Sequence, residues 1–220
     1  MSLLVDLHTH AWPTPDAERL VFHSFHQKES GLAQYALPFS AGLHPWFLEP
    51  AHMEPQWAWL DVALSLPNLR MVGEIGLDRL RGPALDIQVA CLEKVLLKAE
   101  ALGKPALFHC VRAYEELNRL VSHPPRRIPL ILHGFTGGLN KLKGLLPYPY
   151  YFSFGAAILR DGHPVLEAFQ AVPIGRLFLE TDDSGRDIAD LYDRAAQLRR
   201  LSLSELEIQI WENSIKIGIA

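Results

Sequence analysis

The chain has 220 residues, of which 49% are hydrophobic and 21% are charged, and its formal net charge is −4. This composition is typical of a globular protein with a sizeable core, and it excludes a disordered, collagen-like or disulfide-stapled chain. The negative total also excludes a global positive field, so binding of a polyanion would need a local basic patch or bound cations.

Short apolar runs, several ending in a polar or ionisable residue, recur along the chain. Their length, their bounding Gly and Pro residues and their β-branched or aromatic content indicate buried strands. We therefore predict eight strands: Leu3–His8, Arg19–His23, Ala41–His44, Met71–Glu74, Ala106–His109, Leu130–His133, Tyr151–Phe154 and Arg176–Thr181.

Amphipathic stretches follow most of these runs. The clearest is Ala84–Leu102, where apolar residues recur at steps of three and four before Gly103 ends the helix. Weaker helices of the same kind are predicted at Arg112–Val121, Leu139–Leu146, Val165–Ala171 and Asp187–Leu201. A last helix is predicted to open with a capping box made by Ser204 and Glu207.

Alternating strands and helices indicate βαβ units around a parallel sheet, and eight strands predict an α/β fold of the distorted TIM (β/α)8-barrel type. Residues 1–220 are predicted to form a single domain. We expect the distortion in the first half, because only ten residues, two of them prolines, separate His8 from Arg19. An open doubly wound sheet is the alternative fold, but no Gly-x-Gly-x-x-Gly sequence follows the first strand.

Ionisable side chains gather at the predicted strand ends. His8 and His10 lie two apart on the first strand, so their rings point to the same side. Further donors stand at or just after later strands, and the carboxyl ends of barrel strands converge on one mouth. The predicted ligands of one or two divalent ions (Mg²⁺, Mn²⁺ or Zn²⁺) are His8, His10, Glu74, His109, His133 and Asp182.

This donor set favours hydrolysis by a metal-activated water. Glu74 is placed to hold two cations close together, and Asp182 to bind one cation and accept the proton of the attacking water. We therefore predict Asp182 and Glu74 as catalytic residues. Cys110 points away from the neighbouring His109 on its strand, and we interpret it as a packing residue.

Several motifs resemble those of the TatD-related hydrolases, a family similar in fold to the metal-dependent amidohydrolases. The resemblance runs from the first strand to the final helix. It is carried by Asp6–His10 (DLHTH), Gly42–Pro45 (GLHP), Gly73–Asp78 (GEIGLD), His109, His133–Gly137 (HGFTG), Glu180–Asp182 (ETD) and Asn213.

The resemblance implies a metal-dependent hydrolase of phosphodiester bonds, such as a deoxyribonuclease, with the six donors above as metal ligands. It also implies that His44 contacts the substrate phosphate. The chain differs from the family at the substrate rim. The family usually has an arginine two residues after the histidine of the fifth strand, whereas here Val111 stands there and Arg112 follows it. The proline that usually follows the ETD motif is replaced by Asp183 and Ser184.

Basic residues in the loops that follow the later strands suit a phosphate substrate. We predict Arg79 and Arg112 as substrate-binding residues; Arg81, Arg160, His163 and Arg186 lie in similar loops. Four aromatic residues, Trp12, Trp46, Tyr114 and Phe135, are expected near the mouth, where covering the barrel is a plainer role than stacking on bases. For support of the metal-binding histidines we consider Asp6 and Asp78.

Three other functions compete with this interpretation. One is a metal-dependent hydrolase of a small phosphoester, ester or amide substrate on the same barrel, although no lysine ends a central strand. Another resembles the polymerase and histidinol phosphatase family, whose closing Asp-x-His is absent, because Asp183 and Ser184 follow Asp182. The last is a non-catalytic barrel, which the complete donor set disfavours.

The cellular setting is predicted from what the chain lacks. Its two cysteines form no framework, no apolar run reaches the length of a membrane span, and Asp6 interrupts the apolar start. We expect a soluble, cytoplasmic monomer that acts on DNA or another phosphoester without a membrane or an obligatory protein partner.

Overall fold

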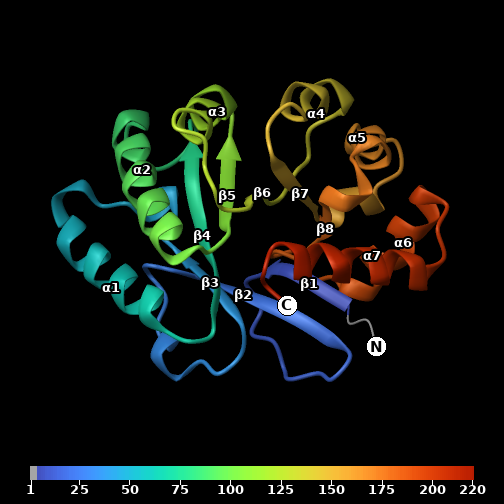
Figure 1. Ribbon diagram of the computed structural model, residues 1–220, viewed down its shortest axis with the longest axis horizontal. Coiled ribbons are helices and arrows are strands. Elements are labelled where there is room, and N and C mark those ends of the chain that lie inside the picture. The colour runs from blue at the N-terminus through green and yellow to red at the C-terminus, as the bar shows by residue number, and fades with distance from the viewer. Residues whose placement is uncertain (1–3) are drawn as a thin grey trace. The chain divides into compact units, whose positions relative to one another are not determined.

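The computed structural model describes residues 4–220 (Figure 1). All eight predicted strands are confirmed, with shifted ends; Leu3, the first residue of the first predicted strand, lies outside the described residues. The strands are β1 (Leu4–Thr9), β2 (Arg19–His26), β3 (Phe39–Gly42), β4 (Leu69–Asp78), β5 (Ala106–Val111), β6 (Leu130–Leu132), β7 (Tyr150–Phe154) and β8 (Leu177–Leu179).

The predicted helices are also confirmed. They are α2 (Leu85–Leu102), α3 (Tyr114–Ser122), α4 (Leu139–Leu145), α5 (Val165–Ala171), α6 (Ile188–Arg199) and α7 (Leu203–Lys216), and the structure adds α1 (Met53–Ser65). Gly103 ends α2 as expected, because its φ of 62° is the left-handed conformation that glycine adopts without strain. Among residues 4–220, no helix combines the length and the apolar character needed to cross a membrane.

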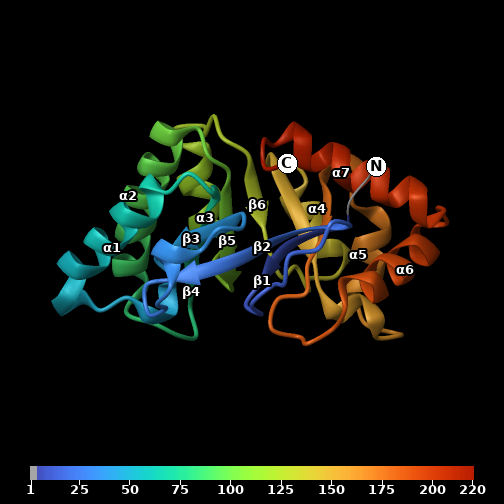
Figure 2. The same ribbon diagram turned by 90° about the horizontal axis from the view of Figure 1, so that it is seen from below.

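The sheet follows chain order from β1 to β8, and the neighbouring pairs β1–β2, β3–β4, β4–β5 and β7–β8 are parallel. This is the order of a (β/α)8-type barrel, so the alternative of a doubly wound sheet is wrong. The predicted distortion is confirmed. β1 and β2, which run side by side in Figure 2, are joined without a helix.

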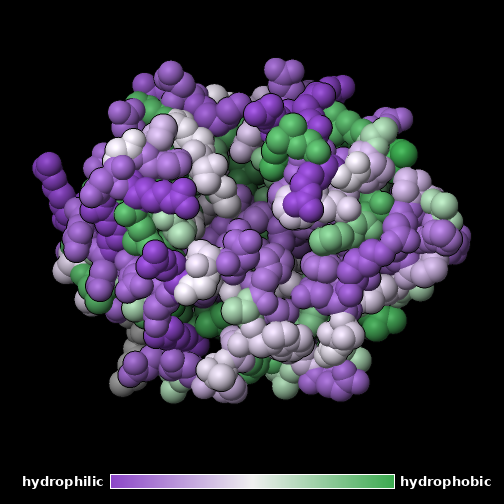
Figure 3. Space-filling model, turned by 180° about the vertical axis from the view of Figure 1, so that it is seen from behind, coloured by the Kyte–Doolittle hydropathy of each residue, from purple (hydrophilic) through white to green (hydrophobic). Residues whose placement is uncertain are grey.

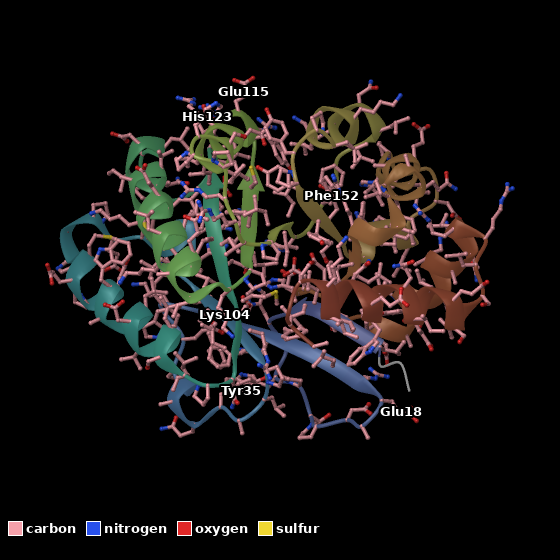
Figure 4. All side chains as sticks on the ribbon, viewed as in Figure 1. Glu18, Tyr35, Lys104, Glu115, His123 and Phe152 are labelled. Atoms are coloured by element: carbon pink, nitrogen blue, oxygen red, sulfur yellow. The ribbon has the colours of Figure 1, made fainter. Side chains whose placement is uncertain are left out.

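The chain divides into two compact units, the first made of residues up to His23 together with Ile131–Ala220 and the second of Ser24–Leu130. In the first unit Phe135 packs edge-on against Phe152 and Phe154, and Figure 4 shows Phe152 among the elements of this unit. In the second unit α2 lies against β4, whereas Glu115 on α3 points outward in Figure 4. On the face seen in Figure 3, hydrophobic residues form separate patches among hydrophilic ones.

Two of the shifted strand ends leave predicted ligands inside their strands. β4 continues to Asp78, so Glu74 lies in the middle of that strand and not at its end, and His109 lies two residues before the end of β5. The reason is Gly76, whose φ is 151° and where a Cβ would stand 1.9 Å from the carbonyl oxygen of His109. Glycine therefore lets β4 continue in close contact with β5, whereas the sequence suggested that the strand ends at Glu74.

The predicted capping box of the last helix is wrong. Ser202 and Glu205 form it, and not Ser204 and Glu207. The same Ser-x-x-Glu spacing occurs two residues earlier, and only Leu201 separates Ser202 from Arg200, the left-handed C-cap of α6. Helix α1 was not predicted because its apolar residues surround the helix and give no single stripe; Val62, for example, is 53% exposed.

Candidate metal centre

In the first unit, three predicted ligands lie together. His8 and His10 are at the end of β1, and Asp182 follows β8. The Oδ1 atom of Asp182 is 3.4 Å from Nε2 of His8 and 3.7 Å from Nε2 of His10. Two backbone hydrogen bonds fix this arrangement. The N–H of Asp182 donates to the carbonyl of His8, and the N–H of His10 donates to the carbonyl of Asp182. The ligating atoms of the three residues lie within 4.8 Å of one another.

His133 and Glu180 extend this group. Nδ1 of His133 is 3.4 Å from Oε1 of Glu180, and the rings of His133 and His8 are 4.5 Å apart. Glu180 is completely buried, and its Oε1 accepts a 2.6 Å hydrogen bond from the N–H of Gly134. With Asp182, these two residues form a second set of possible ligands. Glu180 was not among the ligands predicted from the sequence, although strand alternation places it on the same side as Asp182.

In the second unit, the predicted residues His44, Glu74 and His109 form a buried group from β3, β4 and β5 or their ends. Oε2 of Glu74 is 3.5 Å from Nε2 of His44 and 3.8 Å from Nδ1 of His109. The three residues are at most 9% exposed. Such burial of a carboxylate between two imidazoles fits a site for positive charge.

Asp78, at the end of β4, orients His109. Its Oδ2 accepts hydrogen bonds from Nε2 of His109 at 3.0 Å and from the indole N–H of Trp46 at 2.5 Å. Because Nε2 carries the proton, Nδ1 of His109 presents its lone pair toward Glu74. Burial raises the pKa of Asp78, but the hydrogen bonds from His109 and Trp46 outweigh it, so the pKa lies below its ordinary value.

His44 differs from His109 in its hydrogen bonding. Its Nδ1 accepts from the N–H of Trp46 at 3.2 Å, so the neutral ring carries its proton on Nε2, which faces Glu74. This tautomer suits a hydrogen-bond donor better than a metal ligand. The role of His44 in binding substrate stays a prediction.

Asp6 has a different role from Asp78. Its two carboxylate oxygens accept from the N–H and the hydroxyl of Thr181, at 2.9 and 2.6 Å. Asp6 therefore ties β1 to the segment that carries Asp182. Burial raises the pKa of Asp6 to about 7 although both Thr181 bonds lower it. Of the two carboxylates that we considered as supports for a histidine, Asp78 makes the direct contact.

The predicted substrate-binding arginines have different environments. Arg79 pairs with Glu116, whereas Arg112 is exposed in the turn between β5 and α3. Among the aromatic residues, Phe135 is only 1% exposed and belongs to the core, which leaves it no face for a base. Trp12 is 61% exposed and stacks on His23.

The donors fit divalent cations. Imidazole nitrogens and carboxylate oxygens in one group are the usual ligands of Zn²⁺ and Mn²⁺. Oε2 of the completely buried Glu180 has no hydrogen-bond donor within residues 4–220, which fits a positive charge nearby. Metal ligation by His8, His10, Glu74, His109, His133 and Asp182 stays a prediction.

Comparison with known proteins points to one family. The family model described as TatD related DNase matches residues 26–217. The 3′-5′ ssDNA/RNA exonuclease TatD of Edwardsiella piscicida is 34% identical over 149 residues, which are 65% of this chain and 56% of that protein. An uncharacterized metal-dependent hydrolase of Haemophilus influenzae is 27% identical over 158 residues, 66% of this chain and 58% of that protein. The chain thus spans under two thirds of the length of these curated relatives.

Solved structures support the fold. YjjV of Escherichia coli, a TatD homologue, matches with a TM-score of 0.76 and 24% identity, over 90% of this chain and 85% of that one. A TatD family hydrolase of Entamoeba histolytica matches with a TM-score of 0.79 and 15% identity, over 100% of this chain and 99% of that one. With the strand order above, these matches confirm the predicted barrel-type fold.

Proposed function

From the premise that the chain belongs to the TatD related DNase family, we propose that it is a divalent-metal-dependent hydrolase of phosphodiester bonds that acts on nucleic acid as a deoxyribonuclease. The observation that carries the proposal is the position of Asp182, one oxygen of which lies within 3.7 Å of two imidazole nitrogens. The name of the relative from Edwardsiella piscicida supports single-stranded DNA or RNA as the substrate class.

The chain's own residues supply the ligands that would hold the metal ions and the group that would accept a proton. His8, His10 and His133 offer nitrogen ligands in the first unit, and Glu74 and His109 offer ligands in the second. Divalent ions bound by such ligands would polarise the phosphate oxygens and lower the pKa of a water molecule. Asp182, whose side chain is 34% exposed, is accessible from solvent and would accept the proton of such a water.

Other parts of the proposal follow from the sequence. The cofactor would be one or two ions of Mg²⁺, Mn²⁺ or Zn²⁺. His44, Arg79 and Arg112 would bind the phosphate groups of the substrate. The single domain 1–220, the monomeric state and the cytoplasmic location likewise stay predictions.

End-labelled single-stranded DNA tests the proposal. We expect shortening from one end in the presence of one of the three ions and none in EDTA. Asp182→Asn and His8→Ala should lower cleavage at least 100-fold, because each removes a ligand or the proton acceptor. The matched control is His52→Ala, because this histidine is exposed and belongs to neither donor group.

Two results would contradict the proposal. Undiminished cleavage by Asp182→Asn would remove that residue from the chemistry. Tight metal binding without cleavage of DNA or RNA would keep the hydrolase and exclude the nucleic-acid substrate. A small phosphoester, ester or amide would then be the substrate class to test.

A further inference from the structure

A cavity of about 630 Å³ adjoins the metal-binding group of the first unit. Its wall comes from the segments that follow β6, β7 and β8, and it includes Glu180 and Asp182. The volume lies within the range of small-molecule sites. A group bound in this cavity would therefore lie beside the carboxylate that we assign to catalysis.

Two arginines line the cavity, and neither forms an ion pair within residues 4–220. These are Arg160, after the short 3₁₀ helix η4 (Ala156–Leu159), and Arg186, before α6. The acidic residue that follows each of them is already paired with another arginine, Asp161 with Arg194 and Asp187 with Arg19. Arg160 and Arg186 thus keep their charge available for an anion, and a guanidinium suits phosphate oxygens.

A histidine lines the same cavity. Nδ1 of His163 accepts the N–H of Val165 at 3.1 Å, so the neutral ring carries its proton on Nε2. His163 and Thr136 both line the cavity. The wall has three carboxylates. Glu180 and Asp182 belong to the donor group described above, whereas Asp183 is exposed and outside that group, and its charge opposes an anion.

We propose that this cavity binds a second phosphate of the substrate, the one next to the phosphate that is cleaved, through Arg160 and Arg186. The inference rests on the proposed function and specifies its substrate: a strand end that carries at least two phosphates. Asp183 weakens this binding because its charge repels the phosphate.

Two substrates separate this role from a role at the scissile phosphate. A thymidine trinucleotide offers a neighbouring phosphate, whereas bis(p-nitrophenyl) phosphate has only the phosphate that is cleaved. We expect Arg160→Gln and Arg186→Gln each to lower kcat/KM about 10-fold for the trinucleotide, and the double variant about 100-fold. Hydrolysis of the small diester should be unchanged.

Two further variants make the test sharper: one that should raise the activity and one that should leave it unchanged. Asp183→Asn should raise kcat/KM for the trinucleotide by a few-fold. Arg200→Gln, which removes an equal charge from an exposed residue outside the cavity lining, should have no effect. Equal losses on both substrates, or no loss on either, would overturn the second-phosphate site.

Binding without metal distinguishes failure of this inference from failure of the proposed function. In EDTA we expect calorimetry to detect thymidine 5′-monophosphate but not thymidine, with binding lost in the double arginine variant. If the wild type cleaves no nucleic acid but shows this binding, the phosphate site stands and the proposed function fails. If it cleaves DNA while the monophosphate binds equally to the double variant, the inference fails alone.

Discussion

Trp46 donates its indole N–H to the oxygen of Asp78 that also accepts from His109. The guanidinium of Arg81 lies 3.7 Å from the centre of the Trp46 ring, which holds the indole in place. The contact orients the carboxylate, and the carboxylate orients the histidine. Trp46 is therefore a positioning residue for the proposed ligand His109.

The Trp46→Phe substitution tests this role, because it removes the N–H and keeps a ring for Arg81. We expect the affinity for Mn²⁺ or Zn²⁺ to fall about 10-fold, as is usual when a partner of a metal-binding histidine is weakened. Calorimetric titration measures the change. Trp59→Phe, on α1, makes the same chemical change away from Asp78 and should leave the affinity as in the wild type. If the two variants bind metal equally, Trp46 only covers the site.

Helix α6 begins at a residue with two functions. Asp187 is its N-cap and accepts from the N–H of Ala189, and both its oxygens bond Arg19 at 2.8 and 3.2 Å. The cap and the arginine hold the pKa of Asp187 below its ordinary value of 3.8. Because the folded-state pKa is depressed, the stabilisation is present above pH 3.8 and is lost as the pH falls through the folded-state value.

Two substitutions of Asp187 separate the cap from the ion pair. Asp187→Ala should lower the free energy of unfolding by about 1 kcal/mol at pH 7, because no acceptor remains for Ala189. Asp187→Asn keeps an acceptor and loses only an exposed ion pair, so its cost should be a few tenths of a kcal/mol. Urea unfolding at pH 7 and in acid measures both, and the difference between wild type and Asp187→Asn should disappear in acid. Equal losses for both variants at pH 7 would show that the charge, and not the cap, stabilises α6.

At the scale of the whole molecule, the sequence predicted the strands and helices well, because buried strands carry strong apolar signals. It predicted that His8, His10 and Asp182 would come together, since alternation on β1 and the end of β8 determine their side chains' directions. It did not predict that Glu74 lies inside β4, because that depends on the close approach of Gly76 to His109. Nor did it choose between Asp6 and Asp78, because hydrogen-bond partners depend on distances that strand alternation does not determine.

Metal removal is the prediction that involves the whole chain. The proposed ligands come from strands far apart in sequence, such as β1, β6 and β8 in the first unit, so an ion would bind the folded chain and not the unfolded one. An ion at 100 times its Kd adds about 2.7 kcal/mol to the free energy of unfolding. For a chain of this length, the Tm should rise by roughly 5–10 °C relative to EDTA.

Thermal unfolding at several Mn²⁺ concentrations measures this shift, which should grow with the logarithm of the free ion concentration. Asp182→Asn and His8→Ala should remove most of it, because each takes a proposed ligand from the group that β1 and β8 build. His52→Ala should keep the full shift. An undiminished shift in Asp182→Asn would mean that the stabilising ion lies elsewhere in the fold. The arrangement of His8, His10 and Asp182 would then hold the ends of β1 and β8 together and would not bind a metal.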